Sequence, residues 1–492
     1  MLAVKLDKHQ FEYDIHSLVK AFYPETDVKV FVEGEKELVS EDGFPLVEVI
    51  LEENRIAMKV SFTEGEAISM DEKTNTQIDF ATGEGRSDYK NELKQIIYRG
   101  LSKATGKELP WGTLTGIRPT KIPMTFLEEG KSEEEILAYM QEVYYVSKEK
   151  GRLAIDIAKR EKELLSVIHY KDGYSLYIGI PFCPTTCLYC SFTSYPICVW
   201  KDRVDEYLGA MEKEMDFVAE SHKDKILDSV YIGGGTPTTL EADQLRRLLS
   251  KVKATFDFSQ VKEFTVEAGR ADSITREKLE VLKEFGVTRI SVNPQTMKEE
   301  TLRMIGRRAT AAQTVEAFKL AREVGFTNIN MDLILGLPGE DEADVAATIE
   351  AVKELAPDSL TVHSLAIKRA SKLSQWIEEN GISTLNNTDK TMEIAARGAK
   401  ELGMVPYYLY RQKNMSGNFE NVGYATEGNF GIYNILIMEE KQSIVACGAG
   451  TISKRVYPDG RIERCDNVKD VAQYIERIEE MIERKRELFG DS

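Results

Sequence analysis

The sequence lacks any apolar run long enough to cross a lipid bilayer. A stretch of about 18 apolar residues marks a candidate membrane helix, and no such stretch occurs among the 492 residues. The first ten residues, MLAVKLDKHQ, also lack the basic start and the long apolar run of a secretory signal peptide. We therefore expect a cytoplasmic protein without a membrane span.

Cysteine is scarce, with six residues in the whole chain. So few cysteines in a chain of this length do not form the disulfide framework of a small secreted domain. Three of them, Cys183, Cys187 and Cys190, nevertheless fall within eight residues. In a reducing compartment, clustered cysteines indicate a metal site or a reactive site.

Positive charge is also in short supply. The 64 lysines and arginines are outnumbered by 82 aspartates and glutamates, so the net charge is −18. An acidic chain is poorly suited to nonspecific binding of nucleic acid or of an anionic membrane surface. We expect a monomer whose partners include no nucleic acid. The length allows two or three domains.

The three clustered cysteines have the spacing C-x3-C-x2-C. A loop this short can turn three thiolates toward one centre. A structural zinc site needs four ligands, whereas three thiolates can hold three irons of a [4Fe–4S] cluster and leave the fourth iron open. Two alternatives remain: a zinc site completed by Cys198 or a distant histidine, or three small buried residues without a shared role.

Short apolar runs alternate with amphipathic stretches from about residue 175 onward. This alternation predicts a parallel sheet with crossover helices, curled into a partial (β/α)6 barrel. Catalytic groups of such folds gather at the carboxyl ends of the strands, and the cysteine loop follows the first strand. The predicted strands are 175–180, 229–232, 263–267, 289–292, 328–334 and 359–363, and the predicted helices are 203–221, 241–255, 275–285, 311–324 and 342–355.

The rest of the chain divides into three further parts. Residues 1–108 read as a small α+β domain, with strands at 2–6, 28–32, 46–51 and 56–62 and helices at 11–22 and 87–104. Residues 109–170 read as a linker and two helices, 132–147 and 148–169. The Gly-, Pro- and Thr-rich segment 109–121 is either an ordered linker or a loop that offers Arg118 and Lys121 to an anion.

The core barrel is expected to occupy residues 171–385 and a C-terminal α/β extension residues 386–492. In that extension we predict a helix at 391–402, strands at 434–438 and 443–446, and one charged amphipathic helix at 468–488. We expect this region to cover the substrate site.

The stretch Tyr177–Phe192, YIGIPFCPTTCLYCSF, resembles the cluster loop of radical S-adenosylmethionine (radical SAM) enzymes. More narrowly, it is similar to the oxygen-independent coproporphyrinogen III dehydrogenase family. The resemblance implies a [4Fe–4S] cluster whose open iron binds the amino and carboxylate groups of SAM, and an electron donor of the flavodoxin or ferredoxin type. Cleavage of SAM would then yield a 5′-deoxyadenosyl radical.

Further residues match the SAM contacts of that family at successive strand ends. The run Gly233-Gly-Gly-Thr236 resembles the motif that binds the amino group of SAM. Asp332, in an apolar strand, has the alternative role of a buried structural ion pair. Some members hold a second SAM molecule. The residues that the resemblance assigns to one SAM, or to two, are Tyr177, Tyr189, Phe192, Gly234, Gly235, Thr236, Glu267, Gln295, Arg307, Asp332 and Ala366.

A tetrapyrrole substrate with four carboxylates requires cations, which an acidic protein must concentrate locally. The segment 406–418 combines aromatic and basic side chains and would suit a flat anionic ring. A solvated basic surface is the alternative for each of these side chains. The candidates are Arg308, Lys368, Arg369, Lys372, Arg411 and Lys413.

Two positions depart from the well-characterised dehydrogenases, which have a histidine where this chain has Gly179 and a cysteine where it has Phe192. Phenylalanine at 192 is typical of heme-chaperone relatives. The long N-terminal extension, segment 111–121 and the run YRQKNMSG resemble the branch called HemZ. The resemblance implies oxidative decarboxylation of coproporphyrinogen III to protoporphyrinogen IX. A heme chaperone and another radical SAM reaction on a tetrapyrrole are the alternatives.

Overall fold

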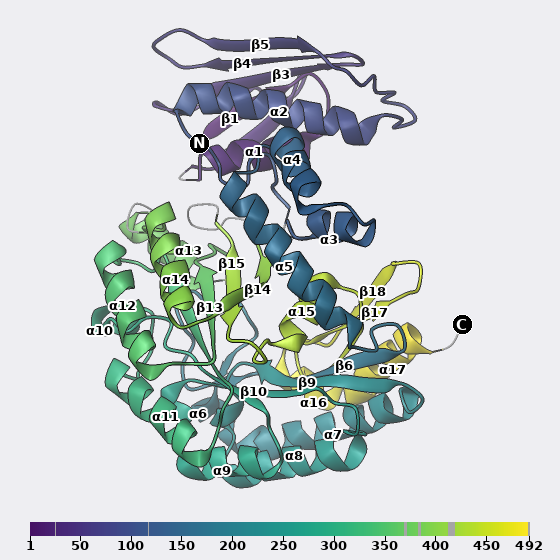
Figure 1. Ribbon diagram of the computed structural model, residues 1–492, viewed down its shortest axis with the longest axis vertical. Helices are drawn as coiled ribbons and strands as arrows, with labels where there is room; N and C mark the ends of the chain where they lie inside the picture. The colour runs from purple at the N-terminus through teal and green to yellow at the C-terminus, as the bar shows by residue number, and fades with distance from the viewer. Residues whose placement is uncertain (25, 117, 369–370, 382–384, 412–418, 491–492) are drawn as a thin grey trace. The chain divides into compact units, whose positions relative to one another are not determined.

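A computed structural model describes residues 1–24, 26–116, 118–368, 371–381, 385–411 and 419–490 (Figure 1). The chain forms two compact units. The first comprises Met1–Ala158 with Arg411–Phe419, and the second comprises Lys159–Tyr410 with Glu420–Ser492. Within the described residues, no helix combines the length and the apolar character that a membrane span requires.

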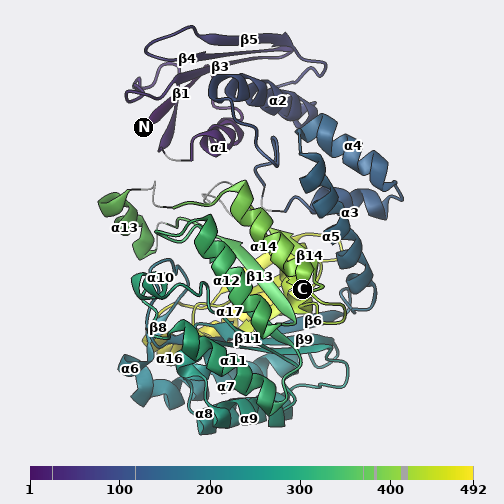
Figure 2. The ribbon, with the colours of Figure 1, turned by 60° about the vertical axis from the view of Figure 1, so that its left-hand side comes forward.

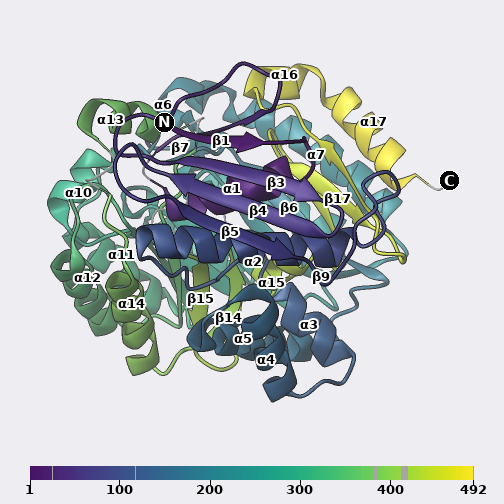
Figure 3. The same cartoon turned by 90° about the horizontal axis from the view of Figure 1, so that it is seen from above.

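The N-terminal unit contains a five-stranded sheet and two helices that pack with it. The sequence predicted both helices and four of the strands and missed the fifth, residues 68–73. The strands lie side by side in the order β2-β1-β3-β4-β5 (Figure 3). Helix α2 packs on β4, β5 and α1. The elements are β1 (Leu2–Leu6), α1 (Glu12–Phe22), β2 (Val28–Val32), β3 (Leu46–Glu52), β4 (Arg55–Ser61), β5 (Ile68–Lys73) and α2 (Arg86–Thr105).

Three helices follow in the chain: α3 (Lys121–Glu128), α4 (Glu133–Tyr144) and α5 (Lys148–Ser166). The last two confirm the helices predicted for 132–147 and 148–169, whereas α3 was missed because Pro123 interrupts its apolar pattern. A capping box begins α4, since the Ser132 hydroxyl accepts from the Glu135 N–H and the Glu135 carboxylate accepts from the Ser132 N–H.

The second unit is organised around an eleven-stranded sheet in the order β14-β15-β13-β12-β11-β10-β9-β6-β16-β17-β18. Its six central strands are parallel and confirm the six predicted from the alternating pattern. They are β6 (Gly173–Ile180), β9 (Ile226–Gly234), β10 (Glu263–Gly269), β11 (Arg289–Val292), β12 (Ile329–Leu335) and β13 (Ser359–Ser364).

The C-terminal region extends this sheet at both ends. Strand β16 (Ser443–Cys447) pairs in parallel with β6, and β17 (Ile452–Val456) and β18 (Ile462–Asp466) continue antiparallel from it. At the other end, β15 (Asn421–Ala425) and β14 (Val405–Tyr410) add antiparallel to β13. The pairing therefore agrees with a parallel core that is a partial barrel.

Helices cover the outer face of the parallel core (Figures 1 and 2). They bury apolar stripes against the strands, as helix-period patterns require. They are α7 (Val204–Ser221), α8 (Ala242–Thr255), α9 (Arg276–Glu284), α10 (Glu299–Met304), α11 (Ala311–Val324) and α12 (Glu342–Leu355). All five helices predicted between the strands begin and end within one residue of the predicted bounds.

Two predictions for the C-terminal region were wrong. Residues 434–438, predicted as a strand, belong to helix α15 (Ile432–Glu439). The Glu263 carboxylate accepts the backbone N–H groups of Ile432 and Tyr433, so β10 supplies the cap that starts this helix. The single helix predicted at 468–488 is two, α16 (Val471–Glu476) and α17 (Ile478–Phe489), which meet at Arg477.

The remaining helices are α6 (Ile197–Trp200), α13 (Lys372–Asn380) and α14 (Asp389–Glu401), of which α14 confirms the helix predicted at 391–402. A buried ion pair connects helix α17 to α7, in which Lys485 Nζ lies 2.6 Å from Glu214 Oε1. The same carboxylate accepts from the Tyr474 hydroxyl and the Gly448 N–H. These bonds satisfy a charge pair that would be costly to bury alone.

Candidate active site

The cysteine loop begins directly after β6, at the carboxyl end of the parallel strands. Its first part forms the short strand β7 (Phe182–Cys183), which pairs with β8 (Tyr195–Pro196). Cys183 and Cys187 are buried and Cys190 is half-buried. The Cys183 thiol lies within electrostatic reach of the thiols of Cys187 and Cys190.

Burial raises the pKa of the Cys183 thiol to about 11, and it raises the pKa of Cys190 as well. Both thiols therefore hold their protons at neutral pH unless a metal replaces them. The described residues contain no group of three or more ligand-type side chains already arranged around a metal position. Three neighbouring thiols are nonetheless the donor set of an iron–sulfur cluster with one open iron. Cys198, the fourth ligand of the zinc alternative, is exposed on α6.

The glycine run after β9 packs directly on the cysteine loop. The N–H groups of Gly235 and Thr236 donate to the carbonyls of Ile180 and Phe182, each at 2.7 Å. A Cβ atom on Gly235 would lie 2.6 Å from the Phe182 carbonyl oxygen and 3.0 Å from the Cys183 sulfur. Glycine is therefore required here for close approach to the loop. The Thr236 hydroxyl lies 3.5 Å from the same sulfur.

Gly234 adopts a backbone conformation that favours glycine, with φ of +106°. It is exposed at the end of β9, and a Cβ atom there would lie 3.5 Å from the Tyr177 hydroxyl. The turn at Gly234 therefore packs close to the Tyr177 side chain.

A stack of tyrosines lies along the inner face of the sheet, beside Glu267. Tyr177 of β6, Tyr231 of β9 and Tyr433 of α15 stack on one another, with ring centroids 4.5–6.0 Å apart. The Tyr231 hydroxyl donates to Glu267 Oε1 at 2.5 Å. Burial raises the pKa of Glu267 to about 7, so this carboxyl is half-protonated near neutral pH.

Gln295 and Arg307 both bury polar atoms that lack a partner among the described residues. Gln295 is 8% exposed, has the left-handed φ of +68°, and leaves Oε1 without a hydrogen bond. Arg307 donates to the Asn293 carbonyl and, at 3.3 Å, to the Tyr189 hydroxyl, but its Nε has no acceptor. Unsatisfied buried groups are rare, and these two fall on residues predicted to bind SAM.

Asp332 lies on β12, where Asn330 Nδ2 donates to its Oδ1 at 2.7 Å. Its Oδ2 is 4.0 Å from His363 Nε2 on β13, and the Tyr410 hydroxyl lies 3.2 Å from His363 Nδ1. Burial lowers the pKa of His363, so this neighbour is a neutral imidazole at pH 7 rather than a permanent cation. Asp332 therefore has no strong buried ion pair to His363.

The other predicted residues are spread more widely. Phe192 is 71% exposed, with Lys368 Nζ 5.4 Å from its ring centroid, and Lys368 is near enough to Cys190 to interact electrostatically. Ala366 is half-buried just after β13, and Arg308 is exposed. Burial lowers the pKa of Lys368.

Arg411 belongs to the N-terminal unit, where it is buried against Trp111 and donates to the Leu114 carbonyl at 2.5 Å. It therefore packs on the segment 109–121 that the sequence singled out. Two predicted substrate residues, Arg369 and Lys413, lie outside the described residues.

Sequence reasoning missed four residues of this region: Tyr231, Arg270, His363 and Tyr433. Arg270 directly follows β10, and its buried guanidinium reaches 3.8 Å from the Cys187 sulfur. The first three had a weak signal, because each lies in or just after a predicted strand. Tyr433 had none, because its helix was predicted as a strand.

The structure also accounts for Gly179, where the well-characterised dehydrogenases have histidine. A Cβ atom at Gly179 would lie 2.4 Å from the Thr451 methyl group, which follows β16. The Gly179 carbonyl accepts from the Tyr207 hydroxyl at 2.6 Å. A histidine could enter only if the segment that carries Thr451 moved.

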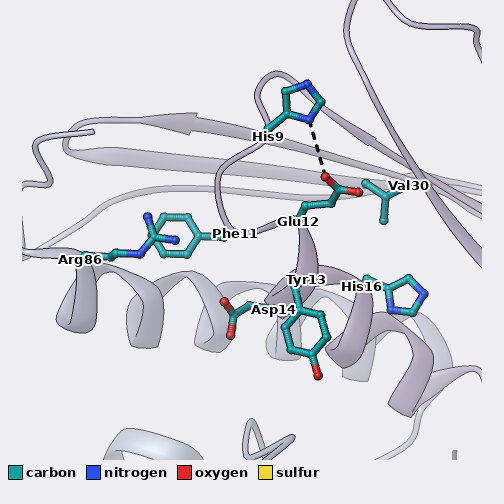
Figure 4. Close-up of a pocket in the computed structure, with 8 residues that line it drawn as sticks. All are labelled: His9, Phe11, Glu12, Tyr13, Asp14, His16, Val30 and Arg86. Carbon is teal, nitrogen blue, oxygen red and sulfur yellow. Dashed lines mark ion pairs between the residues drawn. The ribbon is translucent and has the colours of Figure 1, made fainter. Parts of the chain in front are cut away.

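A separate pocket lies in the N-terminal unit (Figure 4). It measures about 440 Å³ and is lined mainly by α1 and the residues before it. Its charged groups largely engage one another: His9 Nδ1 is 3.6 Å from the Glu12 carboxylate, and the Arg86 guanidinium stacks on Phe11. Among the described residues, His16 has no side-chain hydrogen-bond partner in this pocket, and its Nε2 lies 3.1 Å from the Val28 carbonyl. This arrangement indicates surface and packing roles for His9 and His16.

Comparisons with known proteins identify the family of the chain. The radical SAM superfamily model matches residues 177–352. The oxygen-independent coproporphyrinogen-III oxidase-like protein HemZ of Bacillus subtilis is 42% identical over 412 residues, which are 83% of this chain and 82% of that protein. The heme chaperone HemW of the same organism is 39% identical over 195 residues, which are 39% of this chain and 51% of HemW.

Among solved structures, coproporphyrinogen III oxidase (HemN) from Escherichia coli, described as a radical SAM enzyme, superimposes with a TM-score of 0.51. The match covers 65% of this chain and 72% of HemN at 24% identity, so it supports the fold alone. The similarity to HemZ, by contrast, extends over most of both chains. The chain belongs to the radical SAM superfamily and, within it, to the family of the oxygen-independent coproporphyrinogen-III oxidase-like protein HemZ.

Proposed function

We propose that this protein is a radical SAM oxidoreductase that converts coproporphyrinogen III to protoporphyrinogen IX without oxygen. Superfamily membership implies a [4Fe–4S] cluster and SAM as cofactors. One observation carries the proposal: the cysteine loop, the glycine run and the buried polar groups predicted to bind SAM all lie at the carboxyl ends of the six parallel strands, where catalytic groups of such folds gather.

Cys183, Cys187 and Cys190 would hold the cluster. When bound, the cluster and SAM together would supply a 5′-deoxyadenosyl radical, so the cofactors would perform the difficult chemistry. The chain's contribution is to bury the thiols, so that protons leave only when iron takes their place, and to keep the loop seated on Gly235.

The groups without partners favour a polar ligand beside the cluster loop. Gln295 Oε1 can accept a hydrogen bond and Arg307 Nε can donate one, and a guanidinium suits the carboxylate of SAM. Glu267 and Asp332 offer carboxylate oxygens to ribose hydroxyls. Tyr177 lies beside Gly234, and the backbone of the glycine run is the proposed partner of the amino group of SAM.

A second SAM molecule would contact Gly235, Thr236, Tyr189 and Ala366. The N–H groups of Gly235 and Thr236 already bond to the cysteine loop, so these two residues would contribute other atoms to either SAM. The proposal therefore includes either one SAM molecule or two.

In the proposed reaction, the β-carbon of a substrate propionate would lose a hydrogen atom to the SAM-derived radical. Loss of CO2 and of one electron would then leave a vinyl group, so each of the two events would need a one-electron acceptor. The proposed carboxylate partners are Lys368 and Arg308, which the structure describes. Arg369, Arg411 and Lys413 are the other partners that the sequence predicts. A flavodoxin- or ferredoxin-type protein is the proposed electron donor to the cluster.

The test is an anaerobic assay with the reconstituted full-length protein, dithionite, SAM and coproporphyrinogen III. We expect loss of two CO2 per substrate, with one 5′-deoxyadenosine formed per CO2. SAM cleavage without any change in porphyrinogen mass would contradict the proposed substrate. A product that is heavier by a methyl group would point to a different radical SAM reaction on a tetrapyrrole.

A heme chaperone is the second candidate, because Phe192 stands where the well-characterised dehydrogenases have cysteine and Thr451 fills the space of their histidine. This candidate predicts stoichiometric heme binding and no porphyrin product. Titration of heme into the same preparation, followed by its Soret band, separates the two functions. Release of vinyl product by a preparation that binds no heme would contradict the chaperone.

A further inference from the structure

Arg270 carries a positive charge into the buried region behind the cysteine loop. It is the first residue after β10, and only 4% of the side chain is exposed. A guanidinium stays charged at any physiological pH, so its burial is costly unless its surroundings compensate for it. Those surroundings show what the charge acts on.

One side of the guanidinium contacts the cysteine loop. Its Nη1 donates to the Thr185 carbonyl at 3.1 Å and to the Thr185 hydroxyl at 2.8 Å, and it lies 3.8 Å from the Cys187 sulfur. The Thr185 hydroxyl in turn donates to the Gly306 carbonyl at 2.7 Å. Arg270 thus holds the loop between the first two cysteines and places an N–H group beside the second.

The other side of the guanidinium is engaged by Asp272. Arg270 Nε donates to Asp272 Oδ1 at 3.0 Å, and Nη2 donates to Oδ2 at 2.8 Å. This two-pronged ion pair orients the planar group and offsets part of its charge. Because Asp272 remains 17% exposed on its side chain, water screens the carboxylate more than the guanidinium.

Arg270 differs in this respect from Arg307, the other arginine beside the loop. Arg307 leaves Nε without an acceptor, whereas all three nitrogens of the Arg270 guanidinium group have partners. The contacts of Arg270 run to the cysteine loop and to Asp272.

We propose that Arg270 is a positioning residue that raises the reduction potential of the cluster, with Asp272 moderating its charge. The inference rests on the proposed cluster at Cys183, Cys187 and Cys190. One-electron reduction, from [4Fe–4S]²⁺ to [4Fe–4S]⁺, adds negative charge to the irons and their sulfur ligands. A hydrogen-bond donor and a positive charge at a ligand sulfur favour the reduced state.

The test is a redox titration of the reconstituted full-length protein without SAM, with reduced cluster measured by electron paramagnetic resonance. At one fixed ambient potential, we expect Arg270→Gln to lower the ratio of reduced to oxidised cluster about tenfold. This change corresponds to a reduction potential that is lower by about 59 mV for a one-electron couple. Asp272→Asn leaves the guanidinium uncompensated and should raise the ratio. These opposite signs distinguish an electrostatic role from damage to the loop.

The matched control is Arg247→Gln. Arg247 makes a similar two-pronged bond to a carboxylate, that of Glu212, on the outer helices α8 and α7. We expect the cluster of this variant to have the same reduction potential as that of the wild type. A shift as large as that of Arg270→Gln would show that any lost arginine has the effect and would overturn the inference.

Iron and sulfide contents separate this inference from the proposed function. A wild-type protein that assembles no cluster would overturn both. Normal clusters with an unchanged potential in Arg270→Gln would overturn the inference alone. If Arg270→Gln assembles no cluster, Asp272→Asn decides: a raised ratio supports the inference and an unchanged ratio overturns it.

Discussion

The charged groups buried at the amino end of the parallel sheet bond to protein atoms, whereas two polar groups buried at its carboxyl end lack a partner among the described residues. At the amino end, Asp228 accepts from the His169 ring and backbone and from Gln442, and Glu263 accepts two N–H groups of α15. Arg289 there donates to Asn328 and to the Asn429 carbonyl. These buried charges are all bonded by protein atoms.

At the carboxyl end, buried groups remain incomplete. Gln295 Oε1 and Arg307 Nε have no partner within the described residues, and burial raises the pKa values of Cys183 and Glu267. Burial of unsatisfied groups costs stability, and two of these groups fall on residues predicted to bind SAM, which indicates a site that a ligand completes. The amino end stabilises the fold, and the carboxyl end is left available for chemistry.

The largest expected effect is the loss of activity in Cys190→Ala. Removal of one of three cluster ligands should abolish 5′-deoxyadenosine formation and most bound iron. The midpoint of urea unfolding of the apoprotein should stay close to that of the wild type, since Cys190 is only half-buried. Retained 5′-deoxyadenosine formation would contradict the assignment of the cluster.

Asp228→Ala should have the converse effect at the amino end. It leaves His169 and the buried Gln442 amide without their acceptor, which should cost about 3 kcal/mol of unfolding free energy. Urea unfolding measures this, with Asp216→Ala as the control because Asp216 is an exposed carboxylate. Folded protein should still assemble its cluster. An unchanged unfolding midpoint would show that the bonds of Asp228 do not stabilise the fold and would contradict the stabilising role of the amino end.

Glu267→Gln should alter how stability depends on pH. The pKa of Glu267 rises from 4.5 to about 7 on folding, so between these values the folded protein keeps a proton that the unfolded chain has lost. Rising pH therefore destabilises the wild-type apoprotein, by on the order of 3 kcal/mol through this group. The unfolding free energies of variant and wild type should diverge from pH 4.5 to pH 8. Parallel profiles would contradict the buried carboxyl.

Asp332→Asn should have the smallest effect, about a tenfold weaker affinity for SAM, because a charge-assisted hydrogen bond becomes a neutral one. Iron content should remain normal. Equilibrium binding of SAM to the reconstituted protein measures the change, with Asp216→Asn as the control. An unchanged affinity would leave Asp332 as a structural partner of Asn330 and His363.

The sequence predicted the six core strands because each combines an apolar run with turn residues, and it predicted the cysteine loop from spacing alone. It failed at residues 434–438, an apolar run too short for periodicity to separate helix from strand. The deciding contact, the Glu263 carboxylate at the start of α15, comes from a residue about 170 positions earlier. Local pattern carries no information on such a partner.

The candidate site divides in the same way. Residues within motifs, such as Glu267 and Asp332, were found because a resemblance assigned them. Arg270 and His363 were missed, since their weak signal as residues in or after a strand does not reveal the distances to Cys187 and Asp332 that the folded sheet brings about. Arg411, predicted from its charge, instead packs on Trp111 within the N-terminal unit.

The most direct test of the central claim follows one hydrogen atom. Coproporphyrinogen III that carries deuterium at the β-carbons of its propionates is incubated anaerobically with the reconstituted protein, dithionite and SAM. The account predicts 5′-deoxyadenosine that contains one deuterium, together with vinyl product. Unlabelled 5′-deoxyadenosine with intact substrate would contradict it, because the radical would then never have reached the propionate.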